Sequence, residues 1–134
     1  MALFLGLTRF SFMNDPEFTL IKEERIIQYI RTIPEVMTEP MAIDLRFAKS
    51  MFDKKSVVFI DARDPEDFDL GHIKNAINIP YDYHEDYEKV IDSLDTSDAD
   101  VFIIYCSGEE CSLSIELAEY LFNEWVFDKV LIFE

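Results

Sequence analysis

Cys106 and Cys111 are the residues of this 134-residue chain whose type and position best suit covalent chemistry. Cys106 directly follows the apolar run Val101–Tyr105, and a helical pattern begins at Ser112. A cysteine between a strand and a helix faces backbone N–H groups, whose dipoles lower the thiol pKa and favour the thiolate. Because the thiolate is the form that attacks sulfur, Cys106 is a candidate nucleophile; the alternative is an ordinary buried cysteine at a strand end. The surrounding loop consists of Ser107, Gly108, Glu109, Glu110 and Ser112.

Cys111 places a second thiol on the same loop in a Cys-x4-Cys arrangement. It could resolve a persulfide or sulfenate on Cys106 and so complete a dithiol cycle. That role requires the loop to curl back, because a disulfide needs Cα atoms within about 7 Å of each other. The alternative is that Cys111 begins the helix and packs inward as a small apolar residue. Residue types alone leave both readings open.

From residue 41 onward the apolar pattern alternates between strands and helices, which must position these cysteines. Continuous apolar runs rich in β-branched residues are typical of strands buried on both faces. The predicted strands are 41–44, 56–61, 76–80, 101–105 and 129–133. The predicted helices are 45–52, capped by Asp44, then 82–94 and 112–125. This alternation predicts an α/β fold with a parallel sheet flanked by helices, in which ligands bind at the carboxyl ends of the strands.

The first 40 residues differ from the rest in pattern. Apolar residues recur at helical spacing within 18–31, and Pro34 and Pro40 then interrupt the pattern. We therefore expect an N-terminal helical extension and linker over 1–40, followed by a single domain over 41–134.

The chain is strongly acidic, with 28 Asp and Glu against 12 Lys and Arg and a net charge of −16. This charge argues against a nucleic acid or an anionic membrane surface as partner. Fifteen of the acidic residues and only two of the basic ones lie in 81–134. That half of the chain is either a solvated surface or a docking surface for a basic protein partner.

Targeting and cofactor signals are absent from the sequence pattern. The apolar N-terminus has no basic region before it and no convincing cleavage site, and two cysteines are too few for the disulfide framework of a small secreted protein. We therefore expect a cytoplasmic protein. No apolar run approaches the roughly 20 residues needed to span a bilayer. With three glycines there is no Gly-rich phosphate loop, and we predict neither a cofactor nor a metal.

Residues 57–80 carry a dense motif, in which a strand ending in Asp-x-Arg is followed by Gly-His-Ile and then by an Asn and an Ile-Pro pair. Its positions are Asp61, Arg63, Asp67, Phe68, Gly71, His72, Ile73, Ala76, Asn78, Ile79 and Pro80. The segment resembles the opening signature of rhodanese-like domains, a sulfurtransferase family, and the similarity covers roughly residues 42–133. The resemblance implies the α/β fold of that family and places Cys106 where the family carries its persulfide-forming cysteine.

Several matched residues have expected supporting roles. Asp61 and Arg63 should form a charge-assisted pair near the cysteine loop, structural rather than in contact with substrate. Gly71 should adopt a backbone conformation that other residues resist. His72 should bond locally to the chain rather than act as a catalytic base.

The aromatic residues near the motif have simpler interpretations. Phe68 and Ile73 are predicted core residues, and His84, which no motif supports, is predicted to lie on the surface. Tyr81 and Tyr83 either line the pocket or belong to a surface loop.

The cysteine loop departs from the family pattern in its charge. Active sulfurtransferases of this family usually carry Arg or Lys there, often an Arg five positions after the cysteine, where this chain has Cys111. Glu109 and Glu110 stand in the loop instead of a cation, so the doubly charged thiosulfate should be a poor donor if they face the pocket rather than solvent. A Cys-x5-Arg phosphatase activity is expected even less. We expect a small low-charge sulfur donor or a persulfide-bearing protein instead.

The end of the domain also departs from the family, which normally continues after the last strand with a Gly-Gly turn and a further helix. Here the sequence ends after the predicted strand 129–133. Three explanations stay open: the chain is truncated, the N-terminal helix around 20–33 covers the exposed face, or that face pairs in a homodimer.

The favoured function is a rhodanese-like sulfurtransferase that carries sulfur as a persulfide on Cys106 and uses thiosulfate poorly. Two alternatives remain. One is a non-catalytic binding module with a rhodanese fold, and the other is a thiol redox switch that uses Cys106 and Cys111.

Overall fold

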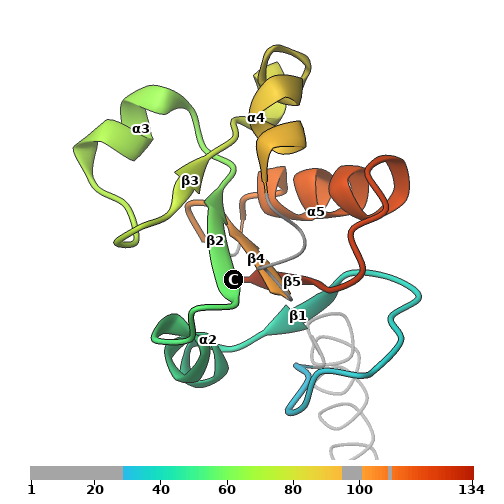
Figure 1. Ribbon diagram of the computed structural model, residues 1–134. Coiled ribbons are helices and arrows are strands. Elements are labelled where there is room, and N and C mark those ends of the chain that lie inside the picture. Colours follow the sequence, from blue (N-terminus) through green and yellow to red (C-terminus); the bar gives the residue numbers. More distant parts are fainter. Residues whose placement is uncertain (1–28, 95–100, 109) are drawn as a thin grey trace, which may run out of the picture.

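The computed structural model describes residues 29–94, 101–108 and 110–134. Its centre is a five-stranded sheet in which every pair of neighbouring strands is parallel, in the order β1-β5-β4-β2-β3 (Figure 1). The strands are β1 (Met41–Ile43), β2 (Val57–Asp61), β3 (Ile77–Asn78), β4 (Val101–Tyr105) and β5 (Val130–Phe133). The predicted parallel α/β sheet is confirmed, although the run expected as a strand over 76–80 pairs over only two residues.

β4 lies at the centre of the sheet, and all five of its residues are buried. It pairs with β2 from Val57↔Val101 to Asp61↔Tyr105, and with β5 from Phe102↔Val130 to Tyr105↔Phe133. Because all strands run in the same direction, the residues that follow β2, β3 and β4 emerge at one edge of the sheet. The strand that leads to Cys106 is therefore buried and hydrogen-bonded to a neighbouring strand on each side.

Helices cover both faces of the sheet. α2 (Leu45–Phe52) lies on one face, while α4 (Glu88–Ser93) and α5 (Leu113–Glu124) lie on the other (Figure 1). The helix predicted over 82–94 is divided into a 3₁₀ segment, η1 (Tyr81–Tyr87), and α4, with non-helical backbone at Tyr83. A short helix that sequence reasoning did not predict, α3 (Pro65–Leu70), begins at a proline, which is favourable in the first helical turn.

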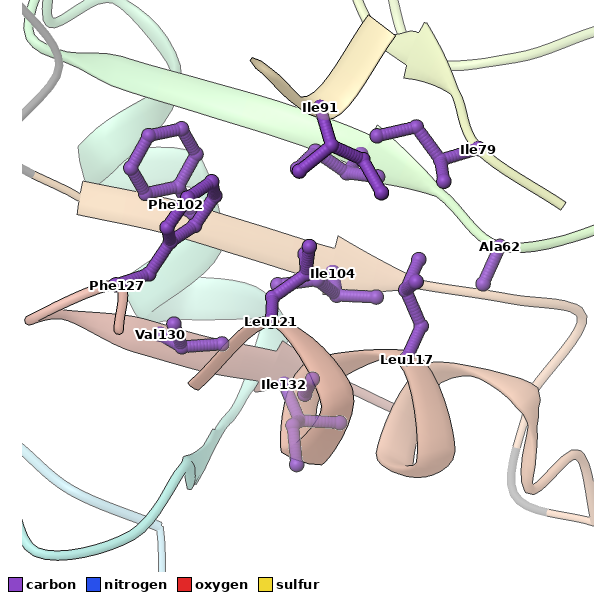
Figure 2. Close-up of a cluster of buried hydrophobic side chains, with 12 residues drawn as sticks. Ala62, Ile79, Ile91, Phe102, Ile104, Leu117, Leu121, Phe127, Val130 and Ile132 are labelled. Atoms are coloured by element: carbon purple, nitrogen blue, oxygen red, sulfur yellow. The ribbon is translucent and has the colours of Figure 1, made fainter. Parts of the chain in front are cut away.

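The core consists of two clusters, one on each face of the sheet. Neighbouring residues of a strand point to opposite faces, so Ile60 and Ile104 belong to the cluster under α5, while Phe59 and Ile103 belong to the cluster under α2. Figure 2 shows the cluster under α5, where α5 contributes Leu117 and Leu121. Both faces of the sheet are therefore covered by apolar side chains.

The segment before β1 packs on the α2 side. Met37 is buried, and Ile30 and Ile33 lie against the same cluster. The Ile30 N–H also donates to the carbonyl oxygen of Ala42 at 3.1 Å. The N-terminal helix predicted over 18–31 lies almost wholly outside the described residues, and residues 29–31 are not helical.

A groove of about 220 Å³ lies between α2 and the end of β5. Its lining is apolar apart from one lysine, and the α2 residues Leu45 and Phe52 are exposed there. The sequence predicted an exposed apolar face without locating it, and pairing of such a face in a homodimer stays a prediction. The residues lining the groove are Leu45, Ala48, Lys49, Phe52, Phe59, Ile73 and Phe133.

Within the described part of the chain, no helix combines the length and the apolar character that crossing a bilayer requires.

Asp44 caps α2 as predicted, because its carboxylate accepts a hydrogen bond from the Phe47 N–H at 2.8 Å. It also lies 4.0 Å from the guanidinium of Arg31, whose side chain is 76% exposed, so that ion pair contributes little.

Replacing Asp44 tests which of these two contacts stabilises the domain. We expect Asp44→Ala to lower the free energy of unfolding by about 1 kcal/mol, since the cap is lost. Asp44→Asn keeps the capping acceptor and loses the ion pair, so it should lie close to the wild type. Urea unfolding followed by circular dichroism measures both variants, and an equal loss in the two would assign the stabilisation to the ion pair instead.

Candidate functional site

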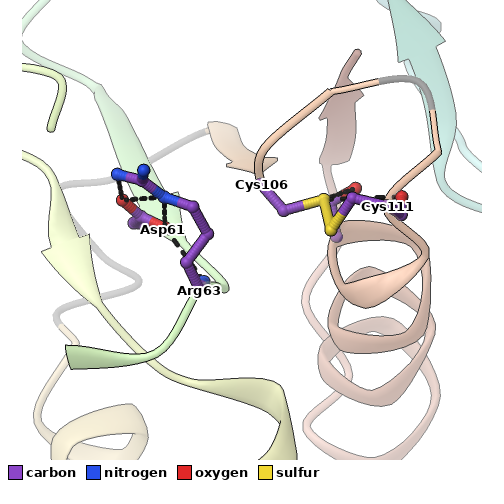
Figure 3. Close-up of a disulfide and its surroundings, with 5 residues drawn as sticks. Asp61, Arg63, Cys106 and Cys111 are labelled. Atoms are coloured by element: carbon purple, nitrogen blue, oxygen red, sulfur yellow. Dashed lines mark hydrogen bonds and ion pairs between the residues drawn. A yellow bond between two sulfur atoms is a disulfide. The ribbon is translucent and has the colours of Figure 1, made fainter. Parts of the chain in front are cut away.

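Cys106 lies directly after β4, in the loop that leads into α5. β2 ends beside it, because Asp61 is the register partner of Tyr105 and the Ala62 N–H donates to the Tyr105 carbonyl at 2.9 Å. Figure 3 shows the two cysteines joined at the start of α5, with Asp61 and Arg63 on the neighbouring strand end. The predicted location of the site at the carboxyl edge of the sheet therefore agrees with the geometry.

Cys106 and Cys111 form a disulfide, with their Cα atoms 6.3 Å apart. Gly108 makes the necessary bend: its φ of +130° lies in a region that favours glycine, and its carbonyl accepts a hydrogen bond from the Cys111 N–H at 2.9 Å. Since α5 begins at Leu113, Cys111 belongs to the loop and not to the helix. The alternative in which Cys111 starts the helix and packs inward is wrong in this structure, because the loop turns its sulfur toward Cys106.

The sulfur of Cys106 has two polar neighbours among the described residues. The hydroxyl oxygen of Ser114 lies 3.3 Å from Sγ, and the carbonyl oxygen of Cys111 lies 3.4 Å from it. We expected backbone N–H groups to face this sulfur, but no such contact occurs among the described residues, and its side-chain neighbour is the Ser114 hydroxyl. A disulfide sulfur carries no hydrogen, so the hydroxyl is the group of this pair that can donate. Sequence reasoning missed Ser114, whose only signal was its place on the apolar, inward side of the predicted helix.

The loop borders an open hollow of about 580 Å³. The residues lining it are Ser107, Gly108, Glu110, Cys111, Ser112 and Leu113. Glu110 is exposed, and no cationic side chain occurs among these lining residues, while Glu109 lies outside the described residues. Neither Tyr81 nor Tyr83 reaches the hollow.

Asp61 and Arg63 form the predicted ion pair. The Asp61 carboxylate is fully buried, and the Arg63 Nη2 lies 2.7 Å from its Oδ2. The Arg63 Nε and backbone N–H also donate to this carboxylate, at 3.0 and 2.9 Å from Oδ1. The hydrogen bonds that Arg63 donates to Asp61 raise the pKa of Arg63 above its ordinary value. Because Nη2 also donates to the Gly71 carbonyl at 2.7 Å, this guanidinium is engaged in structure and is not turned toward the loop hollow.

Asn78 and Tyr105 complete the support of this edge, and sequence reasoning gave neither of them a role. The Asn78 side-chain amide donates to the carbonyl oxygens of Asp61 and Arg63, at 3.1 and 2.9 Å. The hydroxyl oxygen of Tyr105 accepts a hydrogen bond from the Ile73 N–H at 3.0 Å. The motif position of Asn78 was visible in the sequence, whereas the partner of Tyr105 lies 32 residues away along the chain.

His72 bonds locally, as predicted. Its Nδ1 lies 2.7 Å from the Phe68 carbonyl oxygen, and because a carbonyl only accepts, this nitrogen carries the proton. Gly71 departs from its prediction, since its φ of 161° is extended backbone that any residue adopts. Phe68 is not a core residue, because its ring is only half-buried and stacks on the His72 ring at 3.6 Å. Ile73 is half-buried at the margin of the cluster under α2.

His84 was predicted to be a surface residue, and the structure corrects this. It is half-buried, with its ring stacked on Tyr81 at 4.8 Å and tilted against Tyr120 at 4.4 Å. Its Nδ1 bonds the Tyr81 carbonyl at 2.6 Å. Tyr81 packs against the cluster under α5, while Tyr83 is 54% exposed and belongs to the surface.

The described residues hold no group of three or more His, Cys, Asp and Glu side chains arranged to bind a metal ion.

A family model described as the rhodanese-like domain matches residues 44–133. The chain belongs to the rhodanese-like domain family. Curated relatives include proteins called tRNA uridine(34) hydroxylase from Enterobacter sp. (strain 638), Citrobacter koseri and Salmonella paratyphi B, which are 33%, 32% and 33% identical over 60 residues. Each match covers 44% of this rhodanese-like chain and only 17% of the relative.

Tyr105 makes the stability of this rhodanese-like domain sensitive to alkaline pH. Burial raises the pKa of its hydroxyl from 10.0 to about 12. On raising the pH the unfolded chain loses this proton first, so the free energy of unfolding decreases between pH 10 and 12 and is unaffected by this group below pH 10.

Tyr105→Phe tests this linkage. The variant should lose about 1 kcal/mol at pH 7, because the Ile73 N–H loses its acceptor, but it should be destabilised less than the wild type from pH 10 upward. Urea unfolding at pH 7, 10 and 11.5 measures the difference, with the exposed Tyr83→Phe as the matched control. Parallel losses in the wild type and Tyr105→Phe would contradict the assignment.

Proposed function

We propose that this protein is a sulfurtransferase in which Cys106 accepts a sulfane sulfur as a persulfide and Cys111 can close a disulfide with it. The observation that carries the proposal is the pair of cysteines on one loop at the carboxyl end of the central strand, with their Cα atoms 6.3 Å apart. Family membership supports sulfur chemistry at this position. The cysteine pair supports a cycle in which the protein itself supplies the second thiol.

The Cys106 thiolate attacks the outer sulfur of a donor persulfide, the donor leaves as its thiolate, and Cys106 becomes Cys106–S–SH. An acceptor thiolate can then take the outer sulfur and release the Cys106 thiolate, with no net oxidation. Alternatively, the Cys111 thiolate attacks Cys106 Sγ, hydrosulfide leaves, and the two cysteines are oxidised to the disulfide while the sulfane sulfur is reduced. A cellular reductant such as a dithiol protein then restores both thiols.

The charge of the loop supports a donor that is neutral, singly charged or bound to a protein. Glu110 lies at the hollow beside the cysteines, and no cationic side chain is among its described lining residues. Arg63, on the neighbouring strand end, is engaged by Asp61. A doubly charged thiosulfate would approach a carboxylate without compensation. We place this chemistry in the cytoplasm, where a reducing environment keeps the dithiol form available.

The relatives' names refer to a tRNA uridine, and we do not extend that activity to this chain. The shared segment is 17% of their length, and the net charge of −16 opposes the binding of a polyanion. What supports sulfur or redox chemistry is the family model over residues 44–133, which include the cysteine loop.

Mass spectrometry after exposure to a persulfide donor tests the proposal. Incubation of the reduced protein with glutathione persulfide should add about 32 Da, one sulfur atom, to the peptide that contains Cys106. The adduct should persist longer in Cys111→Ser, which retains Cys106 but has no resolving thiol. Cys106→Ser should take up no sulfur at this loop.

The release of hydrosulfide provides the matched measurement. The wild type should release hydrosulfide and form the Cys106–Cys111 disulfide, while Cys111→Ser should do neither. Failure of Cys106 to gain sulfur in both the wild type and Cys111→Ser, with folding intact by circular dichroism, would overturn the sulfurtransferase function.

The disulfide favours one alternative, a thiol redox switch without sulfur transfer. In that case, peroxide should convert the reduced protein to the disulfide and a reductant should restore two thiols, while persulfide donors leave no sulfur on Cys106.

A binding module remains the other alternative, supported by exposed acidic residues on α4 and α5. Such a surface would take a basic protein partner. These residues are Glu88, Asp92, Glu116, Glu119 and Glu124.

A further inference from the structure

We infer that Ser114 is a catalytic residue, whose hydroxyl donates a hydrogen bond to Cys106 Sγ and stabilises the sulfur as the leaving thiolate when the outer sulfur is passed to an acceptor. This inference rests on the proposed sulfurtransferase function and adds a residue that the family motif does not mark. It also predicts that the loop favours delivery of the outer sulfur to an acceptor over resolution of the persulfide by Cys111.

The orientation of the Ser114 hydroxyl is unusual for a serine in a helix of this protein. Ser50 and Ser93 are exposed, and their hydroxyls donate to carbonyl oxygens of their own helices three residues earlier, at 2.6 and 2.7 Å. Ser114 is 1% exposed, and its hydroxyl instead lies 3.3 Å from the sulfur of Cys106, eight residues before it. The sulfur is its sole hydrogen-bond partner among the described residues.

The position of Ser114 would otherwise suit an apolar residue. It lies on the inward side of α5, which continues with the fully buried Leu117, Ala118 and Leu121. A buried hydroxyl costs free energy unless it is bonded, and bonds to charged groups are stronger than bonds to neutral ones. The hydrogen bond from this hydroxyl is therefore strongest when Cys106 is a thiolate, and sulfur delivery produces that state.

Two reactions compete for the persulfide, and Ser114 affects them differently. In delivery, an acceptor thiolate bonds to the outer sulfur, the S–S bond breaks, and the electron pair goes to Cys106 Sγ, directly at the Ser114 hydroxyl. In resolution, Cys111 bonds to Sγ itself, and the electron pair leaves on hydrosulfide, away from Sγ. A donor aimed at Sγ therefore accelerates delivery and leaves resolution nearly unchanged, since a better-stabilised thiolate is a better leaving group.

The pH dependence of Cys106 alkylation tests the contact without requiring any sulfur transfer. In the Cys111→Ser background, the rate of iodoacetamide reaction at Cys106, followed by peptide mass spectrometry, reports the thiolate fraction. Ser114→Ala should lower that rate about tenfold at pH values below both inflections, equivalent to one pKa unit. Ser50→Ala, which removes an exposed serine of α2 away from the cysteine loop, is the matched control and should leave the profile unchanged. Superimposable profiles with and without Ser114→Ala would overturn the inference.

Comparing the rate of sulfur delivery to an acceptor with the rate of hydrosulfide release tests which of the two reactions Ser114 accelerates. With inorganic polysulfide as donor and cyanide as acceptor, thiocyanate measures delivery, because cyanide takes the outer sulfur and releases the Cys106 thiolate. Hydrosulfide measured without cyanide reports resolution. With Cys111 present, Ser114→Ala should slow thiocyanate formation several-fold while hydrosulfide release stays within twofold of the wild type. Equal slowing of both reactions would indicate a general disturbance of the loop and would contradict the inference.

The two tests separate this inference from the function on which it rests. If the wild type takes up no sulfur while Ser114→Ala still shifts the alkylation profile, the sulfurtransferase function fails and the Ser114–Cys106 contact stands. If the wild type takes up and delivers sulfur but the alkylation profile and the partition do not respond to Ser114→Ala, the function stands and the role of Ser114 fails.

Discussion

A fully buried carboxylate, that of Asp61, imposes the main constraint on the functional edge of the sheet. A buried charge is tolerated only when it is paired and hydrogen-bonded, and Arg63 supplies both its guanidinium and its backbone N–H. The same guanidinium holds the Gly71 carbonyl, and Asn78 binds the carbonyls of Asp61 and Arg63. The ion pair and the Asn78 amide thus connect β2, the end of α3 and β3. Tyr105, the residue before Cys106, accepts a hydrogen bond from the Ile73 N–H, so the start of the cysteine loop is tied to the same edge of the sheet.

Much of the fold was accessible from the sequence, because the apolar runs are long, rich in β-branched residues and separated by clear helix signals. The strand Val101–Tyr105 and the cap at Asp44 were predicted at their observed positions, and Asp61 and Arg63 pair as expected from opposite charges two residues apart. α3 was missed because Pro65–Leu70 has three charged positions and too few apolar ones to show helical periodicity.

The site was less accessible, because its geometry depends on contacts that sequence spacing does not encode. Whether Cys111 reaches Cys106 depends on the bend at Gly108, and a Cys-x4-Cys spacing fits a loop that curls and one that does not. Ser114 resembles any small residue on the buried side of a helix until its hydroxyl direction is known. His84 was placed on the surface because its partner Tyr120 comes from a helix 36 positions later, and no local pattern predicts such stacking.

The order of the strands has a consequence for how the chain is made. Within the described part of the chain, β1 comes first among the strands and pairs with β5 alone, the one furthest along the sequence, with Met41 opposite Leu131. During translation, β2 and β4 are complete while β5 has yet to be synthesised, so β1 waits without a partner and with its backbone groups unpaired. A contact between such distant residues is also slow to form, because a long loop must close first. β1 can therefore join the sheet only after residues 130–133 have been synthesised, because β5 lies between β1 and β4. A nascent chain that stops before these residues exposes an unpaired strand edge, which is the kind of surface that chaperones bind.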